Sequence, residues 1–224
     1  MSRTPLNLLL IGANRGIGLE LATQFAARGD NVTISCRHLD DSLEALPFDI
    51  ITDVDITTDA GLNNLKEAVD DQQFDGVFCI AGLLEKVTLD ELDIESIRRQ
   101  FEVNALAPLR VAALLKDHIK PNGKLALMTS RMGSIEDNGS GGSYGYRMSK
   151  TALNAAGKSL AIDLAEQKIA VALLHPGYVR TRMTQFNGLM DSDESAKLLI
   201  ERFDGLNLEN SGSFWHANGE LLPW

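Results

Sequence analysis

Residues 6–18 read Leu-Asn-Leu-Leu-Leu-Ile-Gly-Ala-Asn-Arg-Gly-Ile-Gly, an apolar run that passes directly into a turn rich in glycine. The run at 6–11 has the length and composition of a buried β-strand, and the apolar residues of 16–28 recur with helical spacing until Gly29. A buried strand followed by a tight turn and a helix is the first part of a βαβ unit. We therefore expect strands and helices to alternate along the chain.

The rest of the chain continues this alternation. Apolar runs predict further strands at 31–36, 49–52, 76–80, 124–128, 170–174 and 213–215, and helical patterns cover 58–72, 91–118, 144–167 and 191–203. Nearly continuous apolar strands indicate a parallel sheet that is covered on both faces. Because no internal repeat or long linker divides the 224 residues, we interpret residues 1–224 as one α/β domain. The predicted fold is a Rossmann-type, doubly wound domain with a seven-stranded, mainly parallel sheet and helices on both faces.

Composition excludes several classes of partner. Asp and Glu number 31 against 21 Lys and Arg, and the longest basic run is the pair Arg98-Arg99, so we expect no nucleic-acid partner and no membrane partner. The apolar run 6–11 is too short for a signal core or a membrane span. The two cysteines lie in apolar stretches and the four histidines lack metal-ligand spacing. The sequence predicts a soluble, cytoplasmic protein without a metal site.

The glycines of the first turn indicate a nucleotide site. A doubly wound fold binds the pyrophosphate of a dinucleotide between its first strand and first helix, at the positive end of that helix. Here that turn contains Gly12, Gly16 and Gly18 in the spacing G-x-x-x-G-x-G. One glycine makes the turn, one lets the backbone approach a phosphate, and one packs the helix on the strand. The alternative is a tight turn without a ligand.

The end of the second predicted strand indicates which dinucleotide is bound. A site for NAD places a carboxylate there to hold the ribose 2′-hydroxyl. This strand ends in Ser35-Cys36-Arg37, with no carboxylate before Asp40. A guanidinium at Arg37 can bind a 2′-phosphate, and Arg15 in the glycine turn can reach the same phosphate or stack on adenine. We therefore expect NADP(H), with simple solvation of both arginines as the alternative.

A second group of residues has the pattern of a proton-transfer site. Tyr146 and Lys150 are four residues apart at the start of a predicted helix, so that both lie on one helix face. A free phenol has a pKa of about 10, and a neighbouring lysine together with an oxidised nicotinamide ring is expected to lower it. Ser130 follows the fifth strand, at the sheet edge where this fold binds ligands, and Ser134 is its competitor.

Together these residues resemble the classical short-chain dehydrogenase/reductase family from Leu8 to Trp224. Within that family, residues 142–154 and 219–224 are most similar to the small NADPH-dependent carbonyl reductases of the sniffer and C-factor kind. The resemblance implies that four residues are catalytic: Asn104, Ser130, Tyr146 and Lys150. It implies that the cofactor is held by Gly12, Asn14, Arg15, Gly16, Ile17, Gly18, Arg37, Asp53, Val54, Ala81, Gly82, Tyr146, Lys150, Pro176, Gly177, Val179 and Thr181.

The function predicted from this resemblance is hydride transfer between NADPH and a small aldehyde or ketone, with Tyr146 as the acid/base. A nucleotide-sensing or signalling protein without turnover, and a pteridine reductase, remain as alternatives. Residues 182–190 predict a short substrate lid that contains the flexible, apolar side chains of Met183, Phe186 and Met190. We expect small, mainly hydrophobic carbonyl substrates and a homo-oligomer, either a dimer or a tetramer.

Pro108 predicts an irregularity in the long helical region. Proline has no N–H group, so the carbonyl of Asn104, four residues earlier, loses its regular helical hydrogen bond. We expect a kink and a free carbonyl that holds a water next to Lys150, which would link Tyr146 to solvent. The alternative is that Pro108 begins a separate helix.

Overall fold

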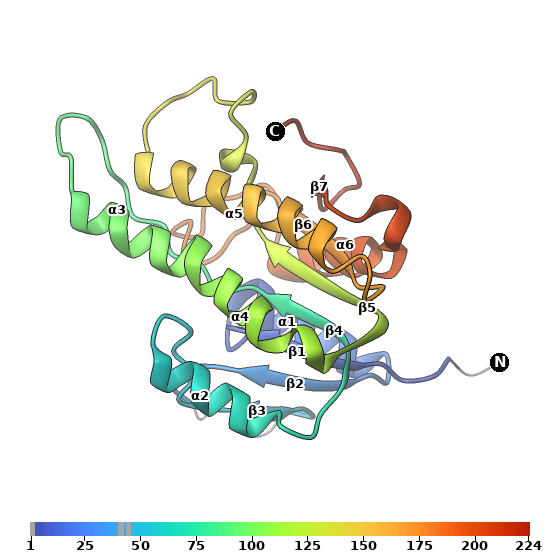
Figure 1. Cartoon of the computed structure of the whole chain (residues 1–224). Coiled ribbons are helices and arrows are strands. Elements are labelled where there is room, and N and C mark those ends of the chain that lie inside the picture. The colour runs from blue at the N-terminus through green and yellow to red at the C-terminus, as the bar shows by residue number, and fades with distance from the viewer. Residues whose placement is uncertain (1–2, 40–42, 44–45) are drawn as a thin grey trace.

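The framework of the protein is a sheet of seven strands in the order β3-β2-β1-β4-β5-β6-β7, which runs from the bottom to the top of the view in Figure 1, with helices in front of it and behind it. The computed structural model describes residues 3–39, 43 and 46–224. Every neighbouring pair of strands is parallel. The chain builds outward from β1 to β3, returns to β4 beside β1, and then builds outward in the other direction. This order confirms the predicted doubly wound, Rossmann-type fold.

The strands and helices lie close to the predicted ranges. The strands are β1 (Asn7–Ile11), β2 (Asn31–Ser35), β3 (Asp49–Ile51), β4 (Phe74–Cys79), β5 (Ile119–Met128), β6 (Ala170–His175) and β7 (Ser213–His216). The helices are α1 (Gly16–Ala27), α2 (Asp59–Ala68), α3 (Ile94–Phe101), α4 (Ala107–Leu115), α5 (Tyr144–Asp163) and α6 (Ser192–Gly205). Strand β5 begins earlier than predicted because the polar segment at its start still pairs with the first residue of β4.

Two hydrophobic cores cover the two faces of the sheet. Successive side chains of a strand point to opposite faces, so Leu9 and Ile11 pack under α2, α4 and α5 while Leu8 and Leu10 pack under α1 and α6. All four side chains are buried. This two-sided burial is the reason that β1 has an unbroken apolar run. Among the helices of the described ranges, none is long and apolar enough to cross a lipid bilayer.

The long helical region predicted at 91–118 is divided in the structure. Asp93 caps α3 by accepting a hydrogen bond from the N–H of Ser96 at 2.9 Å. A π-helical turn, Glu102–Leu106, then joins α3 to α4, and the N–H of Ala107 donates to the carbonyl of Glu102 five residues back. Because Pro108 has no N–H to offer Asn104, the wider turn accommodates the missing bond. The expected irregularity is present, and the chain remains helical through it.

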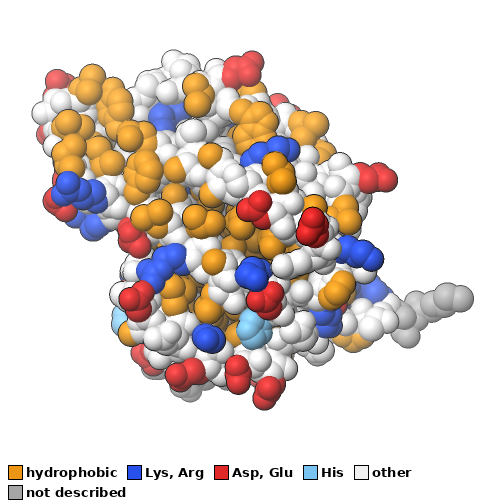
Figure 2. Space-filling model, viewed as in Figure 1, with side chains coloured by type: hydrophobic (Ala, Val, Ile, Leu, Met, Phe, Trp, Pro, Cys, Tyr) orange, Lys and Arg blue, Asp and Glu red, His pale blue; other side chains and the backbone are white. Residues whose placement is uncertain are grey.

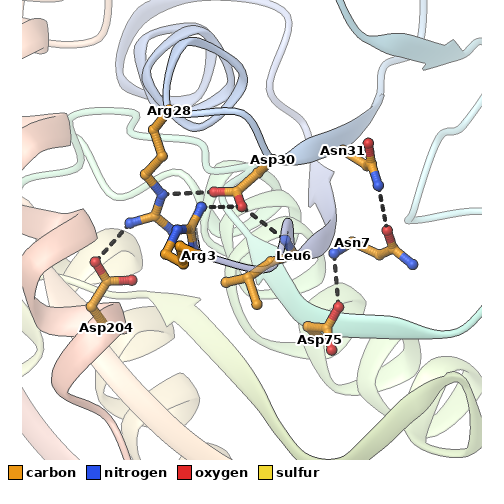
Figure 3. Close-up of polar contacts among 8 residues, drawn as sticks. All are labelled: Arg3, Leu6, Asn7, Arg28, Asp30, Asn31, Asp75 and Asp204. Atoms are coloured by element: carbon orange, nitrogen blue, oxygen red, sulfur yellow. Dashed lines mark hydrogen bonds and ion pairs between the residues drawn. The ribbon is translucent and has the colours of Figure 1, made fainter. Parts of the chain in front are cut away.

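A cluster of charged side chains stabilises the end of the sheet where the parallel strands begin. The buried carboxylate of Asp30 accepts hydrogen bonds from the N–H of Leu6 at 2.8 Å, from Arg28 at 2.7 Å and from Arg3, and Arg28 also contacts Asp204 on α6 (Figure 3). Burial alone would raise the pKa of Asp30, but these hydrogen bonds outweigh burial and hold the pKa below its usual value. The contacts of Asp30 and Arg28 therefore stabilise the end of the sheet where the strands begin. The predicted site lies at the other end, where the strands finish.

Candidate active site

The turn between β1 and α1 has a conformation that requires glycine. At Gly12 the φ angle is +78°, and a Cβ atom there would lie only 2.7 Å from the Cβ of Ala81, beyond the end of β4. At Gly16 the φ angle is +53°, and the nearest atom to a Cβ would be the Cγ2 of Thr181 at 3.7 Å. The glycine turn thus lies close to the segments that follow β4 and β6.

The start of α1 is suited to a phosphate group. Arg15 is the residue that precedes the helix, and its side chain makes no capping hydrogen bond. The N–H groups of the first helical turn have no partner within the helix, and no acidic residue lies in that turn. These N–H groups and the positive end of the helix dipole would attract an anion. Asn14, Arg15, Gly16, Ile17 and Gly18 therefore fit the pyrophosphate of a dinucleotide.

The residues predicted to hold the adenosine end of the cofactor lie together at the end of β2. The N–H of Val54 donates to the carbonyl of Cys36 at 3.0 Å, which places Asp53 and Val54 beside the chain at Arg37. Asp53 has a φ angle of +57°, and its carbonyl accepts a hydrogen bond from Asn64 on α2 at 3.0 Å. Arg37 is exposed, so its guanidinium is accessible to a ligand.

Three predicted catalytic residues from two segments meet at the end of β5. Tyr146 lies in the first turn of α5, Lys150 lies one turn later, and Ser130 follows β5 directly. Ser130 lies close enough to the Tyr146 phenol to lower its pKa, and the Nζ of Lys150 lies 5.8 Å from the centre of the Tyr146 ring. All three side chains are buried. An oxygen atom placed beside Ser130 and Tyr146 would meet two hydroxyl groups.

The pKa values of Tyr146 and Lys150 are shifted by burial. Burial raises the pKa of Tyr146 to about 12, although the hydrogen bond with Ser130 opposes this shift. Burial also lowers the pKa of Lys150 to about 7, and its Nζ donates to the carbonyl of Met128 at 2.8 Å. Removal of water from both side chains dominates these two pKa values, and the lowering expected from Lys150 together with an oxidised nicotinamide ring stays a prediction. Tyr146 stays protonated near neutral pH and can donate its proton.

The lowered pKa of Lys150 predicts a pH-dependent stability. The folded state releases this proton near pH 7, whereas the unfolded chain keeps it until about 10.5, so the unfolded state binds more protons between these values. We therefore expect the free energy of unfolding contributed by Lys150 to increase as the pH rises through that window and to be lost as the pH falls through 7. Urea denaturation of the wild type and of Lys150→Met between pH 6.5 and 9.5 measures this difference, and parallel curves would contradict it.

Asn104 lies in the π-helical turn, and both polar atoms of its side chain make hydrogen bonds to other segments. Its Oδ1 accepts from the N–H of Leu83 at 2.8 Å, and its Nδ2 donates to the carbonyl of Leu83 at 2.7 Å and to the Oγ of Ser149 at 3.0 Å. Ser149 in turn donates to the carbonyl of Tyr146 at 2.9 Å. Only the main chain of Asn104 is therefore left for the predicted water.

Sequence reasoning missed two residues of this surrounding structure. Ser149 connects Asn104 to Tyr146, and Gln100 makes a similar set of contacts one helical turn before Asn104. The available signal for Gln100 was its spacing, because residues four apart on a helix lie on the same face. The signal for Ser149 was its position between Tyr146 and Lys150.

The segment after β6 folds back over the site. Val179 pairs with Met190 in an isolated bridge, so that the residues between them form a closed loop. The Cε of Met183 would lie 3.6 Å from a Cβ at Gly82, and the Nζ of Lys150 would lie 3.7 Å from the same position. The loop therefore brings Met183 close to Lys150. The role of residues 182–190 as a substrate lid stays a prediction.

Apolar side chains are exposed next to the site. Figure 2 shows hydrophobic side chains gathered at the upper left, over α3 and the segment before it. The exposed fractions there are 71% for Leu89, 52% for Leu92 and 48% for Ile94. The loop after β6 also exposes Phe186 and Leu189. These exposed apolar side chains belong to the segment between β4 and α3, to the start of α3 and to the loop after β6.

Comparisons with known proteins agree with this geometry. A family model described as enoyl-(acyl carrier protein) reductase matches residues 12–202. The chain is 35% identical over 223 residues to a 1-hydroxy-2-glutathionyl-2-methyl-3-butene dehydrogenase of Rhodococcus, covering 97% of this chain and 99% of that relative. It is 37% identical over 151 residues to the C-signal protein of Myxococcus xanthus, covering 66% of this chain and 86% of that relative.

A solved structure is similar over nearly the whole chain. A carbonyl reductase from Pseudomonas aeruginosa, determined in complex with NADP, has a TM-score of 0.84 and 29% sequence identity. The similarity covers 98% of this chain and 100% of that one. The protein thus has the same fold as this reductase. In this chain the glycine turn and the cluster of Ser130, Tyr146 and Lys150 both lie at the carboxyl ends of the parallel strands.

Proposed function

The chain belongs to the short-chain dehydrogenase/reductase family, and on that premise we propose that it transfers hydride between NADP(H) and a small aldehyde or ketone. The observation that carries this proposal is the buried cluster of Ser130, Tyr146 and Lys150 beside the glycine turn. When bound, the nicotinamide cofactor supplies or accepts the hydride. The side chains of the protein bind the carbonyl oxygen, deliver its proton and exclude water.

Each residue of the cluster has a task that follows from its environment. Ser130 donates a hydrogen bond to the carbonyl oxygen, and Tyr146 delivers its proton to the same oxygen as negative charge develops there. A phenol with a pKa of about 12 holds its proton until that charge appears, because an alkoxide is a stronger base than a phenolate. In its protonated form Lys150, whose Nζ lies 5.8 Å from the centre of the Tyr146 ring, stabilises the phenolate that remains.

The choice of NADP(H) rests on Arg37. The guanidinium follows β2 at the position where an NAD site carries a carboxylate, and it is exposed to a ligand. The NADP bound to the similar carbonyl reductase supports the same choice. In the proposed complex the glycine turn holds the pyrophosphate, Asp53 and Val54 hold the adenine, and Ala81 and Gly82 lie close to the ribose. The nicotinamide end is surrounded by Pro176, Gly177, Val179 and Thr181.

Asn104 is proposed to take part in a proton path through its main-chain carbonyl, and this predicts a difference between two variants. Pro108→Ala restores an N–H that competes with water for that carbonyl, so turnover should fall while the Kd for NADPH is unchanged. Asn104→Ala should lower turnover further, because it also releases Leu83 and Ser149. Steady-state kinetics and cofactor titration measure both effects. Wild-type turnover in Pro108→Ala would exclude the path.

Assay of a carbonyl panel with NADPH and with NADH tests the proposed function. We expect reduction of small, mainly hydrophobic aldehydes and ketones, because the segments around the site expose apolar side chains and the loop 182–190 is short. A bulky steroid and an acyl thioester should be poor substrates. Turnover of pterins alone would identify a pteridine reductase and contradict the proposal.

The similarity to the C-signal protein favours a second candidate, a signalling protein that binds the nucleotide without turnover. The buried Ser130, Tyr146 and Lys150 argue against it, since a sensor has no need of a proton donor. NADPH binding without reduction or oxidation of any compound in the panel would favour the signalling function. The panel therefore includes alcohols with NADP, so that the reverse reaction is also measured.

A further inference from the structure

Gln100 is a fully buried residue of α3 that has no part in the chemistry proposed above. Its Oε1 accepts a hydrogen bond from the N–H of Glu85 at 3.1 Å. Its Nε2 donates to the carbonyl of Glu85 and to the Oγ of Ser96, both at 3.2 Å. Both donor hydrogens and the acceptor oxygen of the amide are thus used, which is the arrangement expected of a buried side chain that holds its neighbours in place.

Gln100 and Asn104 hold one segment by the same kind of contact. Asn104 binds both main-chain groups of Leu83, and Gln100 binds both main-chain groups of Glu85. Alternate residues of an extended chain present their N–H and C=O groups to the same side. The two side-chain amides therefore make the hydrogen bonds to residues 83 and 85 that a neighbouring strand would otherwise make. The segment follows directly from Gly82, where a Cβ would lie 3.7 Å from the Nζ of Lys150.

The same two amides also contact the beginning of α5. A Cβ at Gly145 would lie 2.6 Å from the Nε2 of Gln100, so this glycine lets the amide approach the residue that immediately precedes Tyr146. On the far side of Tyr146, Asn104 donates to Ser149, which donates to the carbonyl of Tyr146. Gln100 therefore lies between the segment 83–85 and the first turn of α5, and it contacts both.

We propose that Gln100 is a positioning residue for the substrate: it fixes the distance between the segment 83–85 and Tyr146, so that a carbonyl bound between them meets the phenol. This inference rests on the proposed function. Loss of the amide would leave the N–H and C=O groups of Glu85 without protein partners, and the segment would have to move to find water. Substrate placement should suffer, while the distant glycine turn and Arg37 should still bind the cofactor.

The variant Gln100→Met tests this role, because methionine keeps the length of the side chain and removes all three hydrogen bonds. The matched control is Arg99→Gln. Arg99 is the neighbouring residue, and among the described residues its guanidinium forms ion pairs with the carboxylates of Glu85, at 2.9 Å, and Asp93. We expect Gln100→Met to raise KM for the carbonyl about fivefold or more, with a Kd for NADPH within about twofold of wild type. Arg99→Gln should leave KM within about twofold.

Hydrogen exchange gives a readout that does not depend on activity. The amide of Glu85 should exchange faster in Gln100→Met and at the wild-type rate in Arg99→Gln. If Gln100→Met does not fold, Gln100→Glu keeps the shape, removes the amide donors and should raise KM in the same way. An unchanged KM in a folded variant, with or without a loss of stability, would overturn the inference. A wild-type protein that reduces no carbonyl would instead refute the proposed function, and the exchange rates would still show whether Gln100 holds the segment.

Discussion

Tyr146→Phe should lower turnover by about 10² or more, while the Kd for NADPH stays within about twofold of wild type. The change removes the proton donor and keeps the aromatic ring, which is buried at the start of α5. Among the described contacts the Tyr146 hydroxyl holds no other segment in place, so its loss should disturb little of the surrounding structure. Steady-state rates with the best carbonyl of the panel, together with a fluorescence titration of NADPH, measure the two quantities.

Tyr144→Phe is the matched control for this experiment. Tyr144 is the first residue of α5, only partly buried, and no hydrogen bond of its hydroxyl occurs among the described contacts. It should therefore retain the turnover of the wild type. If Tyr146→Phe also kept most of its turnover, another group would have to be the acid, and the proposed mechanism would be wrong.

Arg37→Asp should reverse the cofactor preference. In the wild type, NADPH should bind at least tenfold more tightly than NADH, a difference of about 1.4 kcal/mol. An aspartate at this position repels a 2′-phosphate and can accept a hydrogen bond from a ribose 2′-hydroxyl, so NADH should become the preferred cofactor. Titration of both cofactors against both proteins measures the four dissociation constants.

The control for Arg37→Asp is Arg98→Asp, which makes the same change of charge elsewhere. Arg98 lies on α3, its side chain is 71% exposed, and its ion-pair partner is Glu95 within the same helix. Its replacement should leave the preference for NADPH intact, because exposed charges at a distance are screened by salt. Equal affinities of the wild type for NADPH and NADH would show that Arg37 is not a phosphate ligand.

Periodicity in the chain was enough to predict the architecture. Strand β1 is buried on both faces, so its residues form a continuous apolar run. Such a run indicates a central strand, because a strand with one exposed face alternates apolar and polar residues. The same reasoning located the other strands and most helices. The candidate site could also be predicted, because in a doubly wound sheet the residues that follow strands meet at one edge. Gly12, Ser130 and Tyr146 were found by that rule and by family resemblance.

Other features depend on contacts between segments far apart in the chain, and no local pattern records them. Gln100 and Asn104 bind main-chain groups of residues 83 and 85, and a main-chain partner leaves no signature in the sequence. The pKa values of Tyr146 and Lys150 are set by burial, which the folded packing alone establishes. The alternation of apolar residues thus determines which elements form and how they stack, whereas the protonation and alignment of the site are determined by the neighbours that folding brings to it.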